Sequence, residues 1–282
     1  MTLKIIQTMS IKIIKKGIAD SLQNAGHYGH QHLGIQVGGY MDFLSAQLAN
    51  KIVGNSLNQS LYEIHFPASH FEFEETIFIS ITGANFIPVL NEKSIPMHEK
   101  ILVNKGDVLQ FLQPIQGRVA YLAFSTAVNS NQVPTTLIEE VEQLIFNTSP
   151  IRFIPGPAWN DLDPASIQQL LTVHFHTTLQ SNRMGFQLEG PSIHTIAQKT
   201  YLSAGVTRGT MQLLPNGQII ILMADHQTVG GYPNLGQIIL VDLPRLAQML
   251  HQTPIQFRLS NLSTAHEQYQ FIQAQFTSLS EL

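Results

Sequence analysis

The chain has 282 residues, of which 44% are hydrophobic and only 12% are charged. Ordinary globular chains carry about 25% charged residues, so this composition excludes a disordered or highly charged protein. Cysteine is absent, which excludes disulfides, thiolate zinc sites, iron–sulfur clusters and a cysteine nucleophile. The net charge of −4 gives no basic excess, and we therefore expect no nucleic-acid partner.

The apolar stretches are too short for a membrane protein. None approaches the ~20 residues that a membrane-spanning helix needs. Lys4, Lys12, Lys15 and Lys16 interrupt the N-terminal stretch, so it lacks the continuous apolar region of a signal peptide. We expect a cytoplasmic protein with no membrane partner.

Strand-like patterns dominate the chain, beginning with the alternation at Ile11–Ile14. Phe71–Glu74 alternates apolar and acidic residues with period two, as a half-buried strand does. Ile77–Thr82 is rich in β-branched residues, and Asn104–Asp107 predicts a turn. Further strands are predicted at residues 108–112, 118–124, 151–154, 171–176, 209–214, 218–223, 237–241 and 255–259.

Four segments are predicted to be helices. Asp42 is a suitable N-cap for a helix over residues 43–53, and Gly54 follows its C-terminus. The apolar residues of the second candidate fall on one side of a helix. The remaining candidates are residues 134–146, a short helix capped by Asp161 or Asp163 that ends near Leu170, and residues 243–250.

Many short strands with few helices are typical of barrels and sandwiches, so we predict a mainly β fold. The run Ile77–Gly83 resembles Ile219–Asp225, and this faint internal repeat favours two related barrel domains. The stretch Asn129–Pro134 is predicted to be a linker. The predicted division is an N-terminal barrel at residues 1–130, a linker and helix at 131–149, and a C-terminal barrel at 150–282.

The twelve histidines raise the possibility of a metal site, because neutral imidazoles bind divalent metals. His27, His30 and His32 lie in one Gly-rich segment, and His174 and His176 would share a strand face. Spacing within a loop does not make side chains converge in space. Exposed or hydrogen-bonded histidines are therefore the favoured interpretation, and we expect no metal in this chain.

A glycine pair, Gly38 and Gly39, lies directly before the helix predicted after Asp42. Glycine allows close backbone approach and amide N–H groups are free at a helix start, so an anionic substrate group could bind there. The alternative, a capped helix after a tight turn, is favoured on physical grounds alone.

Arg183 lies in the segment Ser181–Pro191, where Arg, Glu, Asn and Gln residues surround glycines. Arg is suited to two-point recognition of a carboxylate or phosphate. Arg183 is therefore a candidate for binding an anionic group, and the alternative is an internal ion pair with Glu189.

Asp225 follows an apolar predicted strand and precedes a Gly230–Gly231 turn. Polar groups at a strand end, followed by such a turn, are typical of sites at the mouth of a barrel. Asp225 could act as a base or orient His226. The sequence has neither a P-loop pattern nor the nucleophile elbow of α/β hydrolases, so we do not expect this chain alone to hold ATP as a P-loop protein does.

Together these segments resemble the allophanate hydrolase subunit 2 family, also called the KipA or biotin-dependent carboxyltransferase-like family, which includes the C subunit of 5-oxoprolinase. The resemblance runs nearly end to end through many motifs in the same order. The matching segments are residues 17–27, 38–42, 49–55, 82–84, 155–157, 181–191, 203–207, 224–233, 241–243 and 246–248.

The resemblance implies two cyclophilin-like β-barrel domains with a few short helices. It implies one component of an ATP-dependent lactam hydrolase, most directly one that opens 5-oxoproline to glutamate, with ATP bound together with a partner protein. The implied partners are a KipI-like protein, also called allophanate hydrolase subunit 1, and a TIM-barrel-like third component of the LamB/YcsF type.

The resemblance also implies a site in which Arg183 binds an anionic group while Asp225 and Gln227 orient the substrate. These three are the predicted catalytic residues. The predicted substrate-binding residues are Gln23, Asp42, Glu189, His226, Gly230, Gly231 and Tyr232.

The chain keeps the family scaffold more faithfully than the family charges, and a stretch that the family has after the strand at 119–124 is missing. A charge-assisted hydrogen bond is worth about 1.5–3 kcal/mol, so the loss of several ionic groups alters any anion site. The departures are Asn24 and Asn182 in place of Asp, His27, Gln187 and His226 in place of Arg, and Ala204 in place of Glu.

Two other functions stay open. The lost charges favour a non-catalytic, KipA-like regulatory partner that binds a KipI-like inhibitor of a sensor kinase. A carboxylase-associated domain is less favoured, because the sequence has no Met-Lys-Met segment of a biotin carrier, and we expect no biotin in this chain.

Overall fold

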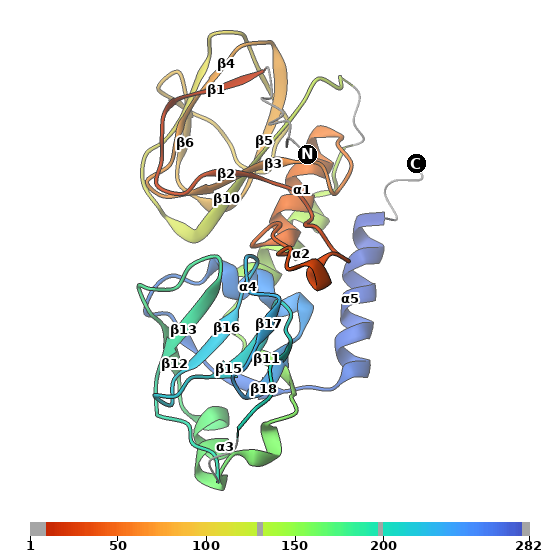
Figure 1. The fold of residues 1–282 in the computed structure, drawn as a ribbon. Helices are drawn as coiled ribbons and strands as arrows, with labels where there is room; N and C mark the ends of the chain where they lie inside the picture. The colour runs from red at the N-terminus through yellow and green to blue at the C-terminus, as the bar shows by residue number, and fades with distance from the viewer. Residues whose placement is uncertain (1–9, 129–131, 197–199, 278–282) are drawn as a thin grey trace. The chain divides into compact units, whose positions relative to one another are not determined.

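The computed structural model describes residues 10–128, 132–196 and 200–277 (Figure 1). Asn129, Ser130 and Asn131 of the predicted linker lie outside the described residues. No helix among the described residues is long and apolar enough to cross a membrane. The fold is mainly β with five α-helices in the described ranges, which confirms the predicted fold class.

The chain divides into two compact units that interleave in sequence. The first contains Met1–Asn24 and Leu44–Ile138, and the second contains Ala25–Phe43 and Glu139–Leu282. A segment of the N-terminal half therefore belongs to the second unit. The linear division at residues 131–149 stays a prediction about the folding domains.

The first unit is built from two five-stranded antiparallel sheets. One has the order β1 (Ile11–Lys15), β4 (His70–Phe73), β9 (Val108–Phe111), β6 (Pro88–Leu90) and β7 (Lys93–Ser94). The other has the order β2 (Ser21–Gln23), β3 (Leu61–His65), β10 (Gln116–Ser125), β5 (Ile77–Asn85) and β8 (Ile101–Val103).

One apolar core joins the two sheets of the first unit. Phe71 and Phe73 of β4 and Ile79 and Ile81 of β5 have no exposed surface. The alternation that predicted these strands therefore reflects one face turned to the core, where each large side chain contributes about 1.5–3 kcal/mol. Helix α1 (Phe43–Val53) has the predicted bounds.

The second unit is organised around one eight-stranded sheet that nearly closes on itself. Its two edge strands, β19 (Pro254–Ile255) and β20 (Phe257–Leu259), are neighbours in sequence. One continuous stretch of chain therefore forms both edges of the sheet. The strands between them are β12 (Phe175–Thr177), β13 (Gly185–Glu189), β16 (Ile219–Leu222), β15 (Thr210–Leu213), β18 (Asn234–Ile238) and β11 (Ile151–Pro155).

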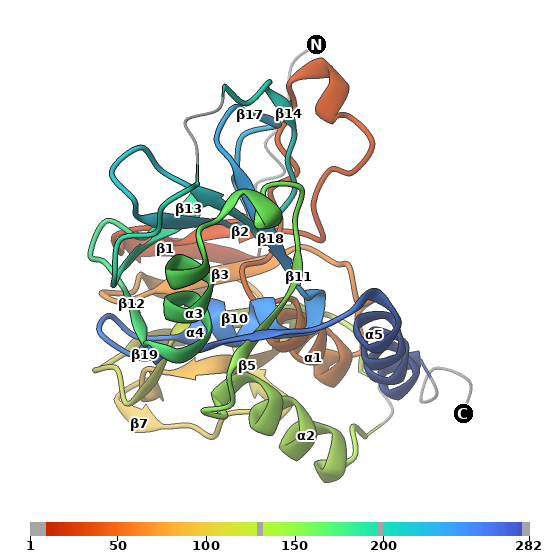
Figure 2. The same cartoon turned by 90° about the horizontal axis from the view of Figure 1, so that it is seen from below.

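A small two-stranded ribbon accompanies this sheet. It consists of β14 (Ala204–Gly205) paired with β17 (Val229–Gly230), which lie side by side in Figure 2. Val206 N–H donates to Thr228 O at 3.2 Å and continues the pairing. One strand of the ribbon, β17, follows β16 in sequence, so the residues between β16 and β17 lie beyond the end of β16.

The other α-helices of the described residues are α2 (Thr135–Phe146), α3 (Pro164–Thr172), α4 (Leu243–Gln248) and α5 (Leu262–Thr277). Of the two predicted caps of α3, the structure selects Asp163, whose Oδ1 accepts from Ser166 N–H at 2.7 Å. Pro164 at the first helical position favours the same start.

Two predictions of secondary structure were wrong, and one helix was not predicted. The strand expected at 171–176 begins only at Phe175, because Leu171 and Thr172 continue α3. The strand expected at 237–241 ends at Ile238, and Leu240–Asp242 forms a single 3-10 turn. Helix α5 was missed, since only Ile272 and Phe276 of its residues are buried and its apolar periodicity is weak.

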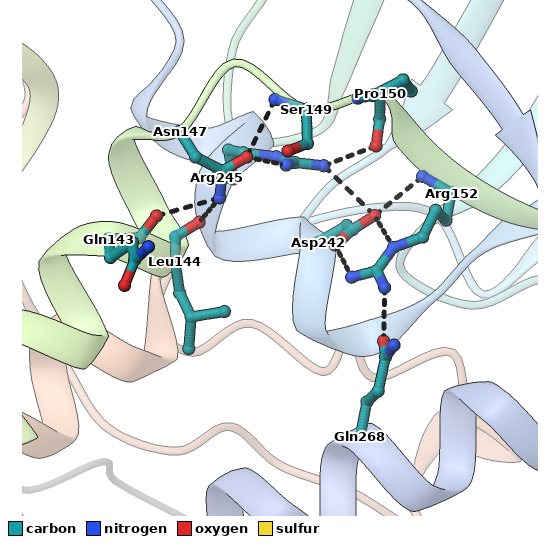
Figure 3. Close-up of polar contacts among 9 residues, drawn as sticks. All are labelled: Gln143, Leu144, Asn147, Ser149, Pro150, Arg152, Asp242, Arg245 and Gln268. Atoms are coloured by element: carbon teal, nitrogen blue, oxygen red, sulfur yellow. Dashed lines mark hydrogen bonds and ion pairs between the residues drawn. The ribbon is translucent and has the colours of Figure 1, made fainter.

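An Arg–Asp–Arg cluster ties several elements of the second unit together (Figure 3). Asp242 accepts from Arg152 through the backbone N–H at 2.7 Å and through Nε and Nη2 at 3.0 and 2.6 Å. Arg245 Nη2 lies 3.3 Å from the same carboxylate and donates to Pro150 O at 2.8 Å. Arg152 also donates to Gln268 of α5 at 2.6 Å, so Asp242 and Arg152 together link β11, α4 and α5.

Candidate active site

The geometry of the second unit places Arg183 beside Asp225. Arg183 lies just before β13 and Asp225 just after β16, and these strands pair with Gly185 opposite Leu222. Arg183 Nε and Nη2 donate to Asp225 Oδ2 and Oδ1 at 2.7 and 2.8 Å. Asp225 N–H donates to Arg183 O at 2.8 Å. The partner of Arg183 is therefore Asp225, whereas Glu189 lies at the opposite end of β13.

The Arg183–Asp225 pair is neither buried nor fully open. The side chain of Arg183 is 16% exposed and that of Asp225 is 34% exposed. A ligand therefore has access to the carboxylate, while the guanidinium is held mainly by protein groups. An anion that binds Arg183 has to compete with Asp225 for the same N–H groups.

The glycine pair predicted to permit close backbone approach lies against this ion pair. Gly39 O accepts from Arg183 Nη2 at 2.8 Å, and Gln36 Nε2 donates to Asp225 O at 3.0 Å. Gly38 and Gly39 have φ values of +65° and +88°. A Cβ on Gly39 would lie 3.0 Å from backbone atoms of Ala25 and Gly26, so both conformation and space require glycine at this position.

Two long side chains hold the residues that follow the glycine pair. Arg208 donates to Tyr40 O at 2.6 Å and also to Met41 O. Gln248 Nε2 donates to Asp42 Oδ2 at 2.8 Å. The carbonyl groups of Gly39, Tyr40 and Met41 thus accept hydrogen bonds from cationic side chains. These contacts indicate that the segment is anchored by arginines, and they do not favour an anion-binding site at its backbone.

The loop after Asp225 contributes a second polar group. Gln227 Nε2 donates to Gln212 Oε1 at 3.3 Å. Gln212 belongs to β15 and is 1% exposed, and Gly230 of the β14–β17 ribbon packs against its amide. Gln227 is half-buried, so it lies between a buried amide and the surface near Asp225.

The other predicted site residues have differing environments. His226 is 1% exposed, and its Nδ1 lies 2.6 Å from Gln227 O. Asp42 is fully buried, whereas Glu189, Gly231 and Tyr232 are exposed. Gln23 belongs to the first unit and donates to Ser21 Oγ at 2.9 Å. Their roles in substrate binding stay predictions.

Sequence reasoning missed Gln36, Arg208, Gln212 and Gln248. Gln212 gave no local signal, because a polar residue between Met211 and Leu213 is the ordinary alternation of a half-buried strand and predicts an exposed side chain. The others act across long sequence separations, so no local pattern identifies them. The described residues contain no group of three or more His, Cys, Asp or Glu side chains that could hold a metal ion.

The sequence matches known proteins over nearly its whole length. It is 28% identical to the C subunit of 5-oxoprolinase from Escherichia coli K12 over 302 aligned positions, which cover 95% of this chain and 97% of that protein. It is 27% identical to the C subunit of 5-oxoprolinase from Haemophilus influenzae, with 87% and 89% of the two chains covered.

Solved structures share the fold at low identity. Urea carboxylase of Kluyveromyces lactis aligns with a TM-score of 0.87 and 18% identity over 96% of this chain, which spans 29% of that protein. Urea amidolyase of K. lactis aligns with a TM-score of 0.86 and 19% identity, and this chain spans 20% of it.

A family profile identifies the chain more directly. The family described as "Carboxyltransferase domain, subdomain A and B" matches residues 33–137 and 127–259. These ranges contain all the paired site residues Arg183, Asp225, Gln212 and Gln227. The chain therefore belongs to the carboxyltransferase domain family of subdomains A and B, in agreement with the resemblance of its motifs, and its relatives include the C subunit of 5-oxoprolinase.

Proposed function

We propose that this chain is one component of an ATP-dependent lactam hydrolase that converts 5-oxoproline to glutamate. The observation that carries the proposal is the match to two proteins named as the C subunit of 5-oxoprolinase, along 95% and 87% of this chain. The partly exposed Arg183–Asp225 pair, with Gln227 beside it, supplies a polar site on which such a substrate could be held.

The geometry suggests a division of roles within this site. 5-Oxoproline carries a carboxylate and a ring amide. The substrate carboxylate competes with Asp225 for Arg183, and the released Asp225 carboxylate then accepts a proton from an attacking water. Gln227 orients the ring amide. Substrate binding and activation of Asp225 are thereby the same event.

ATP fits this site poorly without a partner. Arg183 already donates to Asp225 and to Gly39 O, which reduces its attraction for a phosphate. We propose that a KipI-like protein supplies most of the phosphate contacts and that a LamB/YcsF-type protein completes the complex. ATP would supply the free energy for opening the lactam. A cytoplasmic location of the complex stays a prediction.

The decisive experiment measures ATP-dependent hydrolysis of 5-oxoproline by the co-expressed complex, with this chain present or omitted. Complex formation is verified on the same sample by size-exclusion chromatography. Hydrolysis that requires this chain supports the proposal. A complex that forms without turnover contradicts it and supports the KipA-like regulatory function, which the lost charges at Asn182, His226 and Ala204 favour.

A further inference from the structure

Gln212 occupies an unusual position for a glutamine. All four residues of β15 are buried, and Gln212 itself is 1% exposed. Its neighbours Met211 and Leu213 point to the opposite face of the strand, because side chains alternate. Burial of an amide is unfavourable unless it forms hydrogen bonds, so a glutamine at this position calls for a reason.

The contacts of Gln212 are one-sided. Its Oε1 accepts from Gln227 Nε2 at 3.3 Å. Its Nε2 is buried and has no hydrogen-bond acceptor among the described residues. A Cβ on Gly230 would lie only 2.4 Å from this nitrogen, and Gly230 is not one of the glycines with positive φ. Close approach to Gln212, rather than backbone conformation, therefore explains glycine at position 230.

This arrangement fixes the amide of Gln227. Because Nε2 of Gln227 is directed at Gln212, its Oε1 faces away from Gln212. Within the described ranges, no protein hydrogen bond reaches Gln227 Oε1. The half-buried Gln227 therefore directs its acceptor Oε1, and not the N–H that is bonded to Gln212, toward a ligand beside Asp225.

We propose that Gln212 is a positioning residue that makes Gln227 present its oxygen, so that the site selects ligands with an N–H donor. The ligand class is a cyclic secondary amide, which donates its ring N–H to Gln227 Oε1. A lactone of the same shape has a ring oxygen in place of that N–H and leaves Oε1 without a partner. The inference rests on the proposed function, because it assumes that Gln227 lies in the substrate site.

The test compares 5-oxoproline with its lactone analogue as a competing ligand of the co-expressed complex. In Gln212→Leu, we expect KM for 5-oxoproline to rise about 2- to 10-fold, the range of one net hydrogen bond. We expect kcat to change little and the preference for lactam over lactone to fall by the same factor. The melting temperature should not fall, because the substitution removes a buried unpaired donor.

Two further variants control for a purely structural effect. Gln212→Glu keeps an oxygen opposite Gln227 Nε2 and should restore the lactam preference. Gly230→Ala places a methyl group where the Gln212 amide lies, and it should lower the preference as Gln212→Leu does. This variant serves as the test if Gln212→Leu does not fold.

The possible failures are distinguishable. An unchanged lactam-to-lactone ratio in folded Gln212→Leu overturns the role of Gln212 and leaves the proposed function intact. A wild-type complex without hydrolysis overturns the proposed function. In that case hydrogen exchange of the Gln227 side-chain amide, followed by NMR, tests the positioning by itself: faster exchange in Gln212→Leu supports it, and equal exchange overturns it.

Discussion

The second unit contains two arginine–aspartate arrangements with opposite surroundings. Arg183 and Asp225 form one two-point pair whose side chains are 16% and 34% exposed. In the Arg152–Asp242–Arg245 cluster, the Asp242 and Arg245 side chains are only 4% exposed, and two guanidinium groups share one carboxylate (Figure 3). Burial lowers the pKa of Arg245, while the charge of Asp242 acts in the opposite direction.

The difference separates a structural ion pair from one able to change partners. Removing one member of a buried pair leaves a desolvated charge without compensation, which costs far more than the loss of an exposed pair. Asp242 also receives the backbone N–H of Arg152 and is linked to α5 through that side chain. The Arg183–Asp225 pair has solvent on one side, so a ligand can replace either partner.

The largest effect is expected from Asp242→Ala. This change leaves Arg152 and Arg245 without their carboxylate and should lower the free energy of unfolding by about 3–5 kcal/mol. Urea denaturation followed by circular dichroism measures the change. Glu140→Ala on the exposed side of α2 is the matched control and should stay within about 0.5 kcal/mol. Equal stabilities of the two variants would contradict the structural role of the cluster.

Asp225→Asn should affect activity much more than stability. We expect the free energy of unfolding to change by less than about 1 kcal/mol, because the pair is partly exposed. Hydrolysis of 5-oxoproline by the complex should fall about 100-fold or more, as expected for the loss of a group that handles a proton. Unfolding curves and turnover are measured on the same preparation. Unchanged turnover would remove Asp225 from the site.

A smaller effect tests the backbone that supports the exposed pair. Gly39→Ala combines a left-handed φ with contacts of 3.0 Å to backbone atoms, and we expect it to cost about 2–3 kcal/mol. Gly34 also has positive φ, but a Cβ there meets nothing within 4 Å, so Gly34→Ala should cost about 1 kcal/mol. Denaturation midpoints compare the two; a smaller loss for Gly39→Ala would show that the segment relaxes freely.

The smallest effect is expected for Asp163, the cap of α3, which is held by hydrogen bonds from Ser166 rather than by an arginine. Hydrogen bonds from Ser166 hold the pKa of Asp163 below its ordinary value of 3.8. Its stabilising effect is therefore present above that value and is lost as the pH falls through the lower folded-state pKa. Asp163→Asn keeps a good cap but no charge. The melting temperature of the wild-type chain should fall more between pH 7 and pH 3 than that of the variant; parallel losses would exclude Asp163 as the cause.

Local sequence patterns were sufficient for elements whose signals are local. The period-two alternation at Phe71–Phe73 and the β-branched run from Ile77 each became a strand with a buried face. Helix α1 runs over the predicted residues and ends before Gly54, whose φ is +81°. The Asn104–Asp107 turn also formed, with Asp107 N–H donating to Asn104 O at 3.0 Å. Such features depend on neighbours within a few residues, so they can be recognised directly in the sequence.

Part of the candidate site was also accessible from residue types alone. Arg183 and Asp225 stood out because arginine in a glycine-rich segment and a carboxylate after an apolar strand are unusual in a chain with 12% charged residues. The sequence did not pair them. It suggested Glu189 as the partner of Arg183, because periodicity along one strand contains no information about which strand lies beside it.

Only the tertiary structure shows which distant segments of the chain belong to the same compact unit. Residues 25–43 join the C-terminal unit because Arg183 and Arg208 hold the carbonyl groups of Gly39, Tyr40 and Met41, while Gln248 holds Asp42. The sequence by itself determined the mainly β class, the bounds of helix α1 and the residue types of the site. Partner choice depends on which strand ends converge when the sheet closes, and that is a property of three-dimensional packing rather than of any local pattern.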